Sequence, residues 1–126
     1  MKPRTLSLTM AVVAAAVSAI GAQKPVEKVE PVAVVGCLKE TAPGTWSLVD
    51  ASEPVPSNPN APSPKELAAL PKSGAHEFRL IGTAIFNLPA HRDHSVVVKG
   101  LPIKAEPVSR LNVTSVTMVA EACPGK

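Results

Sequence analysis

The chain has 126 residues, with 13 basic and 10 acidic side chains, two Phe, one Trp and no Tyr. This length predicts one small domain, and a formal net charge of +3 is too small to indicate a nucleic-acid-binding protein. The scarcity of aromatic residues also argues against a surface on which bases could stack.

Residues 1–22 have the layout of a secretory signal peptide. Two basic residues stand near the start, Lys2 and Arg4, then comes an apolar run, and small residues close the segment at Gly21 and Ala22. The apolar run falls short of the roughly 20 residues that a membrane-spanning helix needs. We therefore expect a periplasmic or secreted protein that is not an integral membrane protein after cleavage.

Removal of the signal peptide changes the charge balance. Of the 13 basic residues, Lys2 and Arg4 leave with the signal peptide, so 11 remain against 10 acidic ones, a net charge of +1. Residues 23–31 are rich in charge and Pro, which predicts a disordered tether. The domain itself is expected over residues 32–124.

Five short segments rich in β-branched and apolar residues predict strands, at about 32–39, 45–50, 76–82, from Ser95 onward, and 111–121. A helical turn is expected in the connector before Ser95. In the last strand the apolar residues change from odd to even positions, which predicts a bulge near Thr114-Ser115. Together these features predict an all-β fold, a small five-stranded OB-like (Greek-key) barrel with a short helical connector.

Residues 51–75 form a Pro-rich insertion within this pattern. Because Pro lacks an amide hydrogen and fixes φ, we expect no regular strand ladder there. Pro64 to Leu70 could form one or two helical turns, with Leu67 and Leu70 facing the core. The alternative is a flexible surface loop.

Cys37 lies in the first predicted strand, and Cys123 lies just after the last one. A disulfide between Cys37 and Cys123 would tie these strands together, as expected in an exported chain with two cysteines. An alternative is a lipid-anchored envelope protein, because Val34-Val35-Gly36-Cys37 is similar to the end of a lipobox. Charged residues and two prolines separate Cys37 from the apolar run, however, so the strand cysteine is favoured.

Several motifs as a set resemble a family of small secreted bacterial domains of unknown function with OB-like character. They are Val35-Gly36-Cys37-Leu38, Gly44-Thr45-Trp46-Ser47-Leu48, Phe78-Arg79-Leu80-Ile81-Gly82, Leu88-x-x-His91-x-x-His94-x-Val96-x-Val98-x-Gly100, Leu111-x-Val113-Thr114-Ser115-Val116 and Ala122-Cys123-Pro124. That family usually has His-Val-Gly-His where this chain has His91-Arg92-Asp93-His94. The resemblance implies the fold and export, and it implies no activity or catalytic residues.

His91 and His94 are the strongest candidates for a chemical role. Imidazoles three residues apart on a helical turn can bind zinc or copper, with His76 as a third ligand. A structural role, such as capping the connector, is the alternative. No serine lies in a nucleophile-elbow motif, and a disulfide would make both cysteines inert, so no catalytic residue, cofactor or enzymatic activity is expected.

The sequence therefore predicts an exported, non-catalytic binding or structural module. Its ligand would be an unidentified protein, glycan or small molecule, and nucleic acid is not expected. Trp46 is a candidate binding residue, with a core position as the alternative, and the Pro-rich insertion is the expected contact surface. A periplasmic metal-binding protein that uses His91 and His94 is the second hypothesis.

Overall fold

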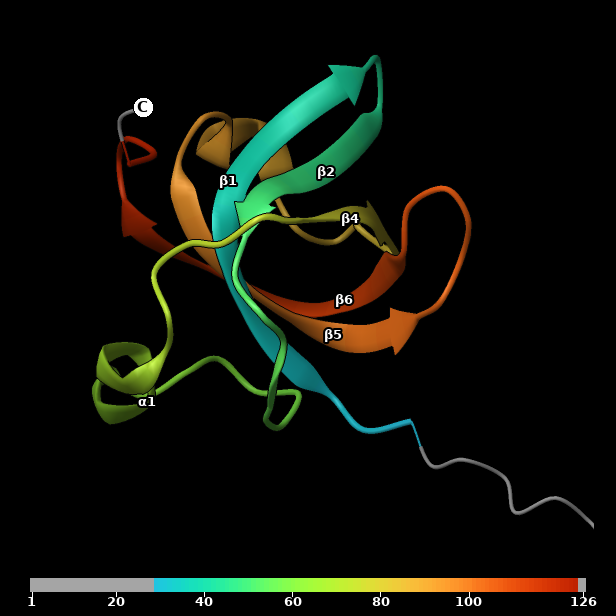
Figure 1. The fold of residues 1–126 in the computed structure, drawn as a ribbon. Helices are drawn as coiled ribbons and strands as arrows, with labels where there is room; N and C mark the ends of the chain where they lie inside the picture. Colours follow the sequence, from blue (N-terminus) through green and yellow to red (C-terminus); the bar gives the residue numbers. More distant parts are fainter. Residues whose placement is uncertain (1–28, 125–126) are drawn as a thin grey trace, which may run out of the picture.

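The computed structural model describes residues 29–124, so the predicted signal peptide and most of the predicted tether lie outside the described residues. Eight elements follow one another within this range (Figure 1). They are β1 (Val32–Ala42), β2 (Thr45–Ala51), β3 (Val55–Pro56), α1 (Pro64–Ala69), β4 (His76–Ile81), the 3-10 helix η1 (Leu88–His91), β5 (Ser95–Ile103) and β6 (Arg110–Ala120).

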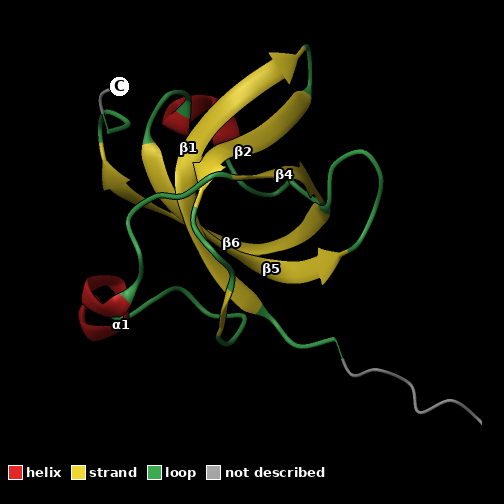
Figure 2. Ribbon diagram, in the orientation of Figure 1, coloured by secondary structure: helices red, strands yellow, loops and turns green. Residues whose placement is uncertain are grey.

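Five of the strands close into a barrel. Their order is β2-β4-β6-β5-β1, and β1 pairs again with β2. β4 and β6 run parallel, whereas every other pair of neighbours is antiparallel. η1 lies in the connection between β4 and β5, at one end of the barrel (Figure 2). The predicted all-β, OB-like barrel with a short helical connector is thus confirmed.

The barrel interior is filled by the apolar residues that alternate along each strand. In β1, for example, Val34 and Leu38 belong to the interior cluster, whereas Val35 packs on the outer face. The interior cluster consists of Val34, Leu38, Trp46, Leu48, Ala51, Phe78, Leu80, Leu88, Val96, Val98, Leu111 and Val113. Leu88 of η1 is among them, so this connector closes one end of the core.

A bulge in β6 lies where the change of apolar positions predicts it. Lys99 of β5 pairs with Ser115, and the next residue, Gly100, pairs with Val113, which leaves Thr114 as the extra residue. Leu111 and Val113 therefore face the interior before the bulge, and Val116 packs against the same core after it. The extra residue bends β6 around the barrel.

The Pro-rich insertion differs from its prediction. The expectation that no part of residues 51–75 joins a strand ladder is wrong, because β3 pairs with the start of β1 through Ala33–Val55 and Val32–Pro56. Pro56 is tolerated because β3 is an edge strand. The predicted helical turns are present as α1. Among residues 29–124, no helix combines the length and apolar character needed to cross a membrane.

Candidate functional site

The insertion covers one outer face of the barrel. Leu67 of α1, Leu70 and Val55 of β3 pack against the outward-facing Val35 of β1 and Val97 of β5. In Figure 1 α1, drawn in yellow-green, lies at the lower left of the view, to the left of the lower half of β1. This packing removes apolar surface from water, which stabilises the docked position by roughly 25 cal/mol per Å² of apolar area.

α1 is a short helix with local signals at its start. The Ser63 hydroxyl accepts a hydrogen bond from the Glu66 amide (3.1 Å), as expected for an N-cap residue, and Pro64 occupies the first helical position. Six residues are too few for a helix that is stable alone, so its formation depends on packing against the barrel.

A buried ammonium group joins the insertion to β5. Lys99 points outward from the barrel, yet its exposed fraction is 0% because the insertion covers it. Its Nζ donates to Oε1 of Glu66 (2.7 Å) and to Oδ1 of Asn58 (3.2 Å), while Ser57 donates to the other oxygen of Glu66. These hydrogen bonds, first of all that from Lys99, hold the pKa of Glu66 below its ordinary value. The insertion therefore supplies both the cover for this charge and its partners.

A row of residues at outward positions crosses four neighbouring strands, β1, β2, β4 and β6. Lys39 of β1 pairs in register with Ser47 of β2, Ser47 with Arg79 of β4, and Arg79 with Arg110 of β6. Arg79 and Arg110 are exposed, and each alternates with buried apolar neighbours, so both side chains leave the barrel on its outer surface. Ser47 is buried, at 2% exposure, so the basic row consists of the three exposed cations Lys39, Arg79 and Arg110.

Arg79 and Arg110 differ from Lys39 because no ion pair neutralises their charge among residues 29–124. Lys39 makes an ion pair with Asp93 (2.8 Å). Within residues 29–124, neither Arg79 nor Arg110 has an ion-pair partner, although Glu77 lies two residues before Arg79 on the same strand. Like charges at opposed positions of neighbouring strands destabilise a sheet. The fold thus holds two adjacent cations that an anion could neutralise.

His91 and His94 lie close together at the end of the barrel that η1 closes. Their ring centroids are 5.7 Å apart, with an edge-to-face orientation. The turn is tied to β1, since the Leu38 amide donates to the His94 carbonyl (3.0 Å) and the Asp93 amide to the Leu38 carbonyl (2.8 Å). The Nδ1 atoms of both rings are buried without a hydrogen-bond partner.

His76, the predicted third ligand, is engaged elsewhere. Its Nε2 lies 2.6 Å from Oε2 of Glu53, and its ring stacks near Phe78. In the part of the chain that the structure describes, no three His, Cys, Asp or Glu side chains come together as a metal-binding group. The structure therefore brings His91 and His94 together without His76, and metal binding by this pair stays a prediction.

Trp46, the predicted binding residue, is a core residue with an exposed fraction of 6%. The Arg92 guanidinium covers its ring, with Cζ 5.6 Å from the ring centroid, and Nη2 of Arg92 contacts Oε1 of Glu40 at 2.5 Å. A ligand would reach little of this ring. Its position matches the core role that the sequence analysis gave as the alternative.

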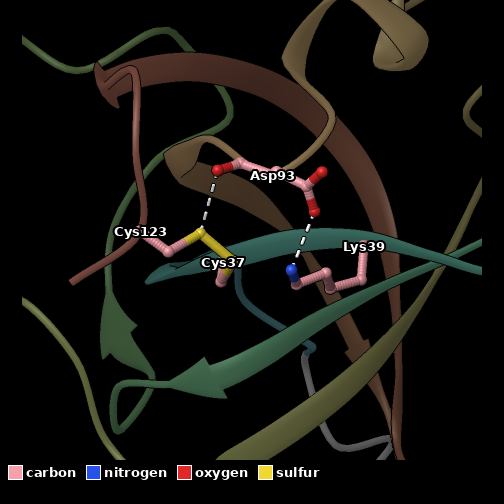
Figure 3. The surroundings of a disulfide bond; sticks show 4 residues. All are labelled: Cys37, Lys39, Asp93 and Cys123. Atoms are coloured by element: carbon pink, nitrogen blue, oxygen red, sulfur yellow. Dashed lines mark hydrogen bonds and ion pairs between the residues drawn. A yellow bond between two sulfur atoms is a disulfide. The ribbon is translucent and has the colours of Figure 1, made fainter. Parts of the chain in front are cut away.

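Cys37 and Cys123 form the predicted disulfide, with their Cα atoms 5.5 Å apart. Figure 3 shows the bond beside the Lys39–Asp93 ion pair. Sγ of Cys123 also lies 3.2 Å from the carbonyl oxygen of Asp93. This is a close contact and not a hydrogen bond, because a disulfide sulfur carries no hydrogen. Lipid attachment at Cys37, the alternative to this disulfide, would require the bond to be absent and stays a prediction.

The residues that the sequence analysis missed are Lys99, Arg79 and Arg110. Alternation places Lys99 on the outer face, where a lysine normally needs no partner, and only the docked insertion buries it. The outward positions of Arg79 and Arg110 follow from alternation, but their adjacency depends on the parallel pairing of β4 with β6. A search of protein-family models, curated proteins and solved structures found no match to this chain.

Proposed function

We propose that this chain is an exported, non-catalytic binding module whose β2–β4–β6 face binds an acidic polysaccharide in the periplasm or outside the cell. The observation that carries this proposal is the pair Arg79 and Arg110, adjacent, exposed and without carboxylate partners among the described residues. An anionic ligand across the two strands would remove the repulsion between the guanidinium groups.

The position of the pair supports binding. In OB-like barrels, the face of the second and third strands, together with the loops after the first and fourth strands, holds oligosaccharides and oligonucleotides. Here the corresponding strands are β2 and β4, and Arg110 directly follows the loop between β5 and β6, which also carries Lys104. The insertion covers the β1–β5 face instead, so the basic row remains open to solvent.

The chemistry of the pair favours carboxylates or sulfates. A guanidinium group presents paired donors that match two oxygens of one acidic group. The basic row contains no aromatic side chain, and single-stranded nucleic acid depends on such side chains for stacking. The disulfide supports an oxidising compartment, where cell-surface polysaccharides occur.

The test is a titration of the oxidised protein, residues 23–126, with polygalacturonate at low salt, with neutral dextran as the comparison. The double variant Arg79→Gln, Arg110→Gln is expected to lose affinity by about tenfold or more, equivalent to about 1.4 kcal/mol. The matched control is Lys65→Gln, Lys72→Gln, which removes the same charge from the insertion. Equal losses in both double variants, or equal binding of dextran, would overturn the proposal.

A further inference from the structure

A groove runs between the insertion and the end of β6, whereas Arg110 of the basic row lies at the start of β6. Its volume is about 360 Å³. The buried Val35 and Val97 contribute to it from the barrel, Leu67 and Ala68 from α1, and Met118 and Val119 from β6. It therefore lies where the barrel surface and the insertion meet.

The groove is apolar because the insertion covers β1 and β5 but stops short of the end of β6. Met118 and Val119 are 44% and 45% exposed, and they are two of the five large apolar residues exposed within residues 29–124. α1 ends at Ala69, and the following Leu70 and Pro71 also line the groove. An apolar strip next to a hollow is thus left in contact with water.

One cation borders this apolar surface. Lys72 lines the groove, its residue is exposed, and it has no ion-pair partner among the described residues. Lys72 also lines a second hollow of about 220 Å³ near the disulfide, together with Asp50 and Ser73. An ammonium group beside an otherwise apolar groove complements a ligand that has an acidic head and an apolar tail.

We propose that this groove binds a small single-chain amphiphile, a medium-chain carboxylic acid, with its alkyl chain between α1 and β6 and its carboxylate at Lys72. The volume lies near the lower end of the roughly 300–1,000 Å³ typical of ligand pockets, which fits one short chain better than a two-chain lipid. Burial of the chain removes both the ligand and the exposed Met118 and Val119 from water. This inference does not depend on the polysaccharide proposal, because it uses another face and another ligand.

The test is a calorimetric titration of the oxidised protein with decanoate below its micelle concentration. Ala68→Phe fills the groove with a ring and is expected to lower the affinity for decanoate by about tenfold or more. Ala69→Phe is the matched control, since Ala69 is the next exposed alanine of α1 and does not line the groove. Fluorescence of the buried Trp46 reports whether each variant is folded.

The acidic head is tested separately. Lys72→Gln is expected to weaken decanoate binding roughly three- to fivefold, the range of a partly exposed ion pair, and to leave binding of decanol unchanged. The proposal is overturned if decanoate does not bind, if Ala68→Phe and Ala69→Phe bind it equally, or if decanol binds as tightly as decanoate. Loss of polygalacturonate binding in the Arg79, Arg110 variant has no bearing on these outcomes.

Discussion

Asp93 occupies a backbone conformation that disfavours most side chains. Its φ is +65°, in the left-handed region where glycine is favoured and Asp is tolerated. Here the carboxylate compensates by pairing with Lys39, and this hydrogen bond is the main reason why the pKa of Asp93 lies below its ordinary value. A charged contact with β1 thus accompanies the unfavourable backbone conformation of Asp93.

Substitution of Asp93 by Ala and by Gly separates these two effects. Both variants lose the contact with Lys39, but only Ala retains the left-handed strain, so Asp93→Ala is expected to unfold about 4 °C or more below Asp93→Gly. Thermal unfolding followed by circular dichroism measures the difference. Lys39→Met, which removes the ion pair alone, is the control. Equal melting temperatures for the Ala and Gly variants would show that the turn relaxes out of this conformation.

Arg92, the residue before Asp93, is also held by contacts with the barrel. Arg92 bridges Glu40 of β1 and the face of Trp46, so it covers the indole ring at the end of the barrel. Arg92 and Asp93 each form an ion pair with β1, one through Glu40 and the other through Lys39. The segment between the two histidines is therefore fastened to the first strand on both sides.

At the scale of elements, the insertion docks through one apolar and one charged contact in addition to the pairing of β3 with β1. Leu67 and Leu70 provide the apolar contact, and the Lys99–Glu66 pair the charged one. Removal of one partner of a buried ion pair leaves an uncompensated charge, which costs about 3–5 kcal/mol when both groups are buried. Glu66 retains 26% exposure of its side chain, so the cost of its loss is expected at or below the low end of this range.

The lowered pKa of Glu66 predicts that the domain loses stability in acid. Because the folded state holds this pKa below the ordinary value of 4.5, its contribution is present above that pH and is lost as pH falls through the folded pKa. We therefore expect a smaller drop in melting temperature between pH 5 and pH 3 for Glu66→Gln than for the parent protein.

Asp93 also has a lowered pKa and contributes a change of the same sign, so the acid dependence of Glu66→Gln is reduced rather than abolished. Glu77→Gln is the control, since Glu77 is an exposed carboxylate outside both contacts. The same pH dependence in Glu66→Gln and the parent protein would contradict the role assigned to the Lys99–Glu66 pair.

At the scale of the whole molecule, one covalent bond spans most of the domain. Cys37 and Cys123 are 86 residues apart, and the bond joins β1 to the segment after β6. Closing a loop of this length lowers the entropy of the unfolded chain and is expected to stabilise the fold by about 4 kcal/mol in the chain-entropy model. Small domains have total stabilities of about 5–15 kcal/mol, so this is a large share.

The Cys37→Ala, Cys123→Ala variant is expected to lose about 4 kcal/mol of unfolding free energy, measured by denaturant titration. Dithiothreitol should destabilise the parent protein by a similar amount and should leave the double variant unchanged. If the variant unfolds at the same denaturant concentration as the oxidised parent, the disulfide does not stabilise the fold by lowering the entropy of the unfolded chain.

The five barrel strands and the helical turns of α1 could be predicted from the sequence because their signals are local, and the disulfide because the chain has two cysteines. Alternating apolar residues define the faces of β1 and β4, and the change of alternation in β6 locates the bulge at Thr114. The docking of the insertion could not be predicted in this way. Its prolines indicated irregular structure correctly over most of its length, but they carry no information about which barrel face it covers.

Sequence by itself determined which residues of this protein point into the barrel, because that choice depends on the period of each strand and on burial of apolar side chains from water. The tertiary structure alone decided which outward-facing residues become neighbours. Closure of the barrel placed Arg79 beside Arg110, and docking of the insertion turned Lys99 from a surface residue into a buried one. Such adjacency depends on the pairing of strands that are distant in the chain, and no local pattern encodes that pairing.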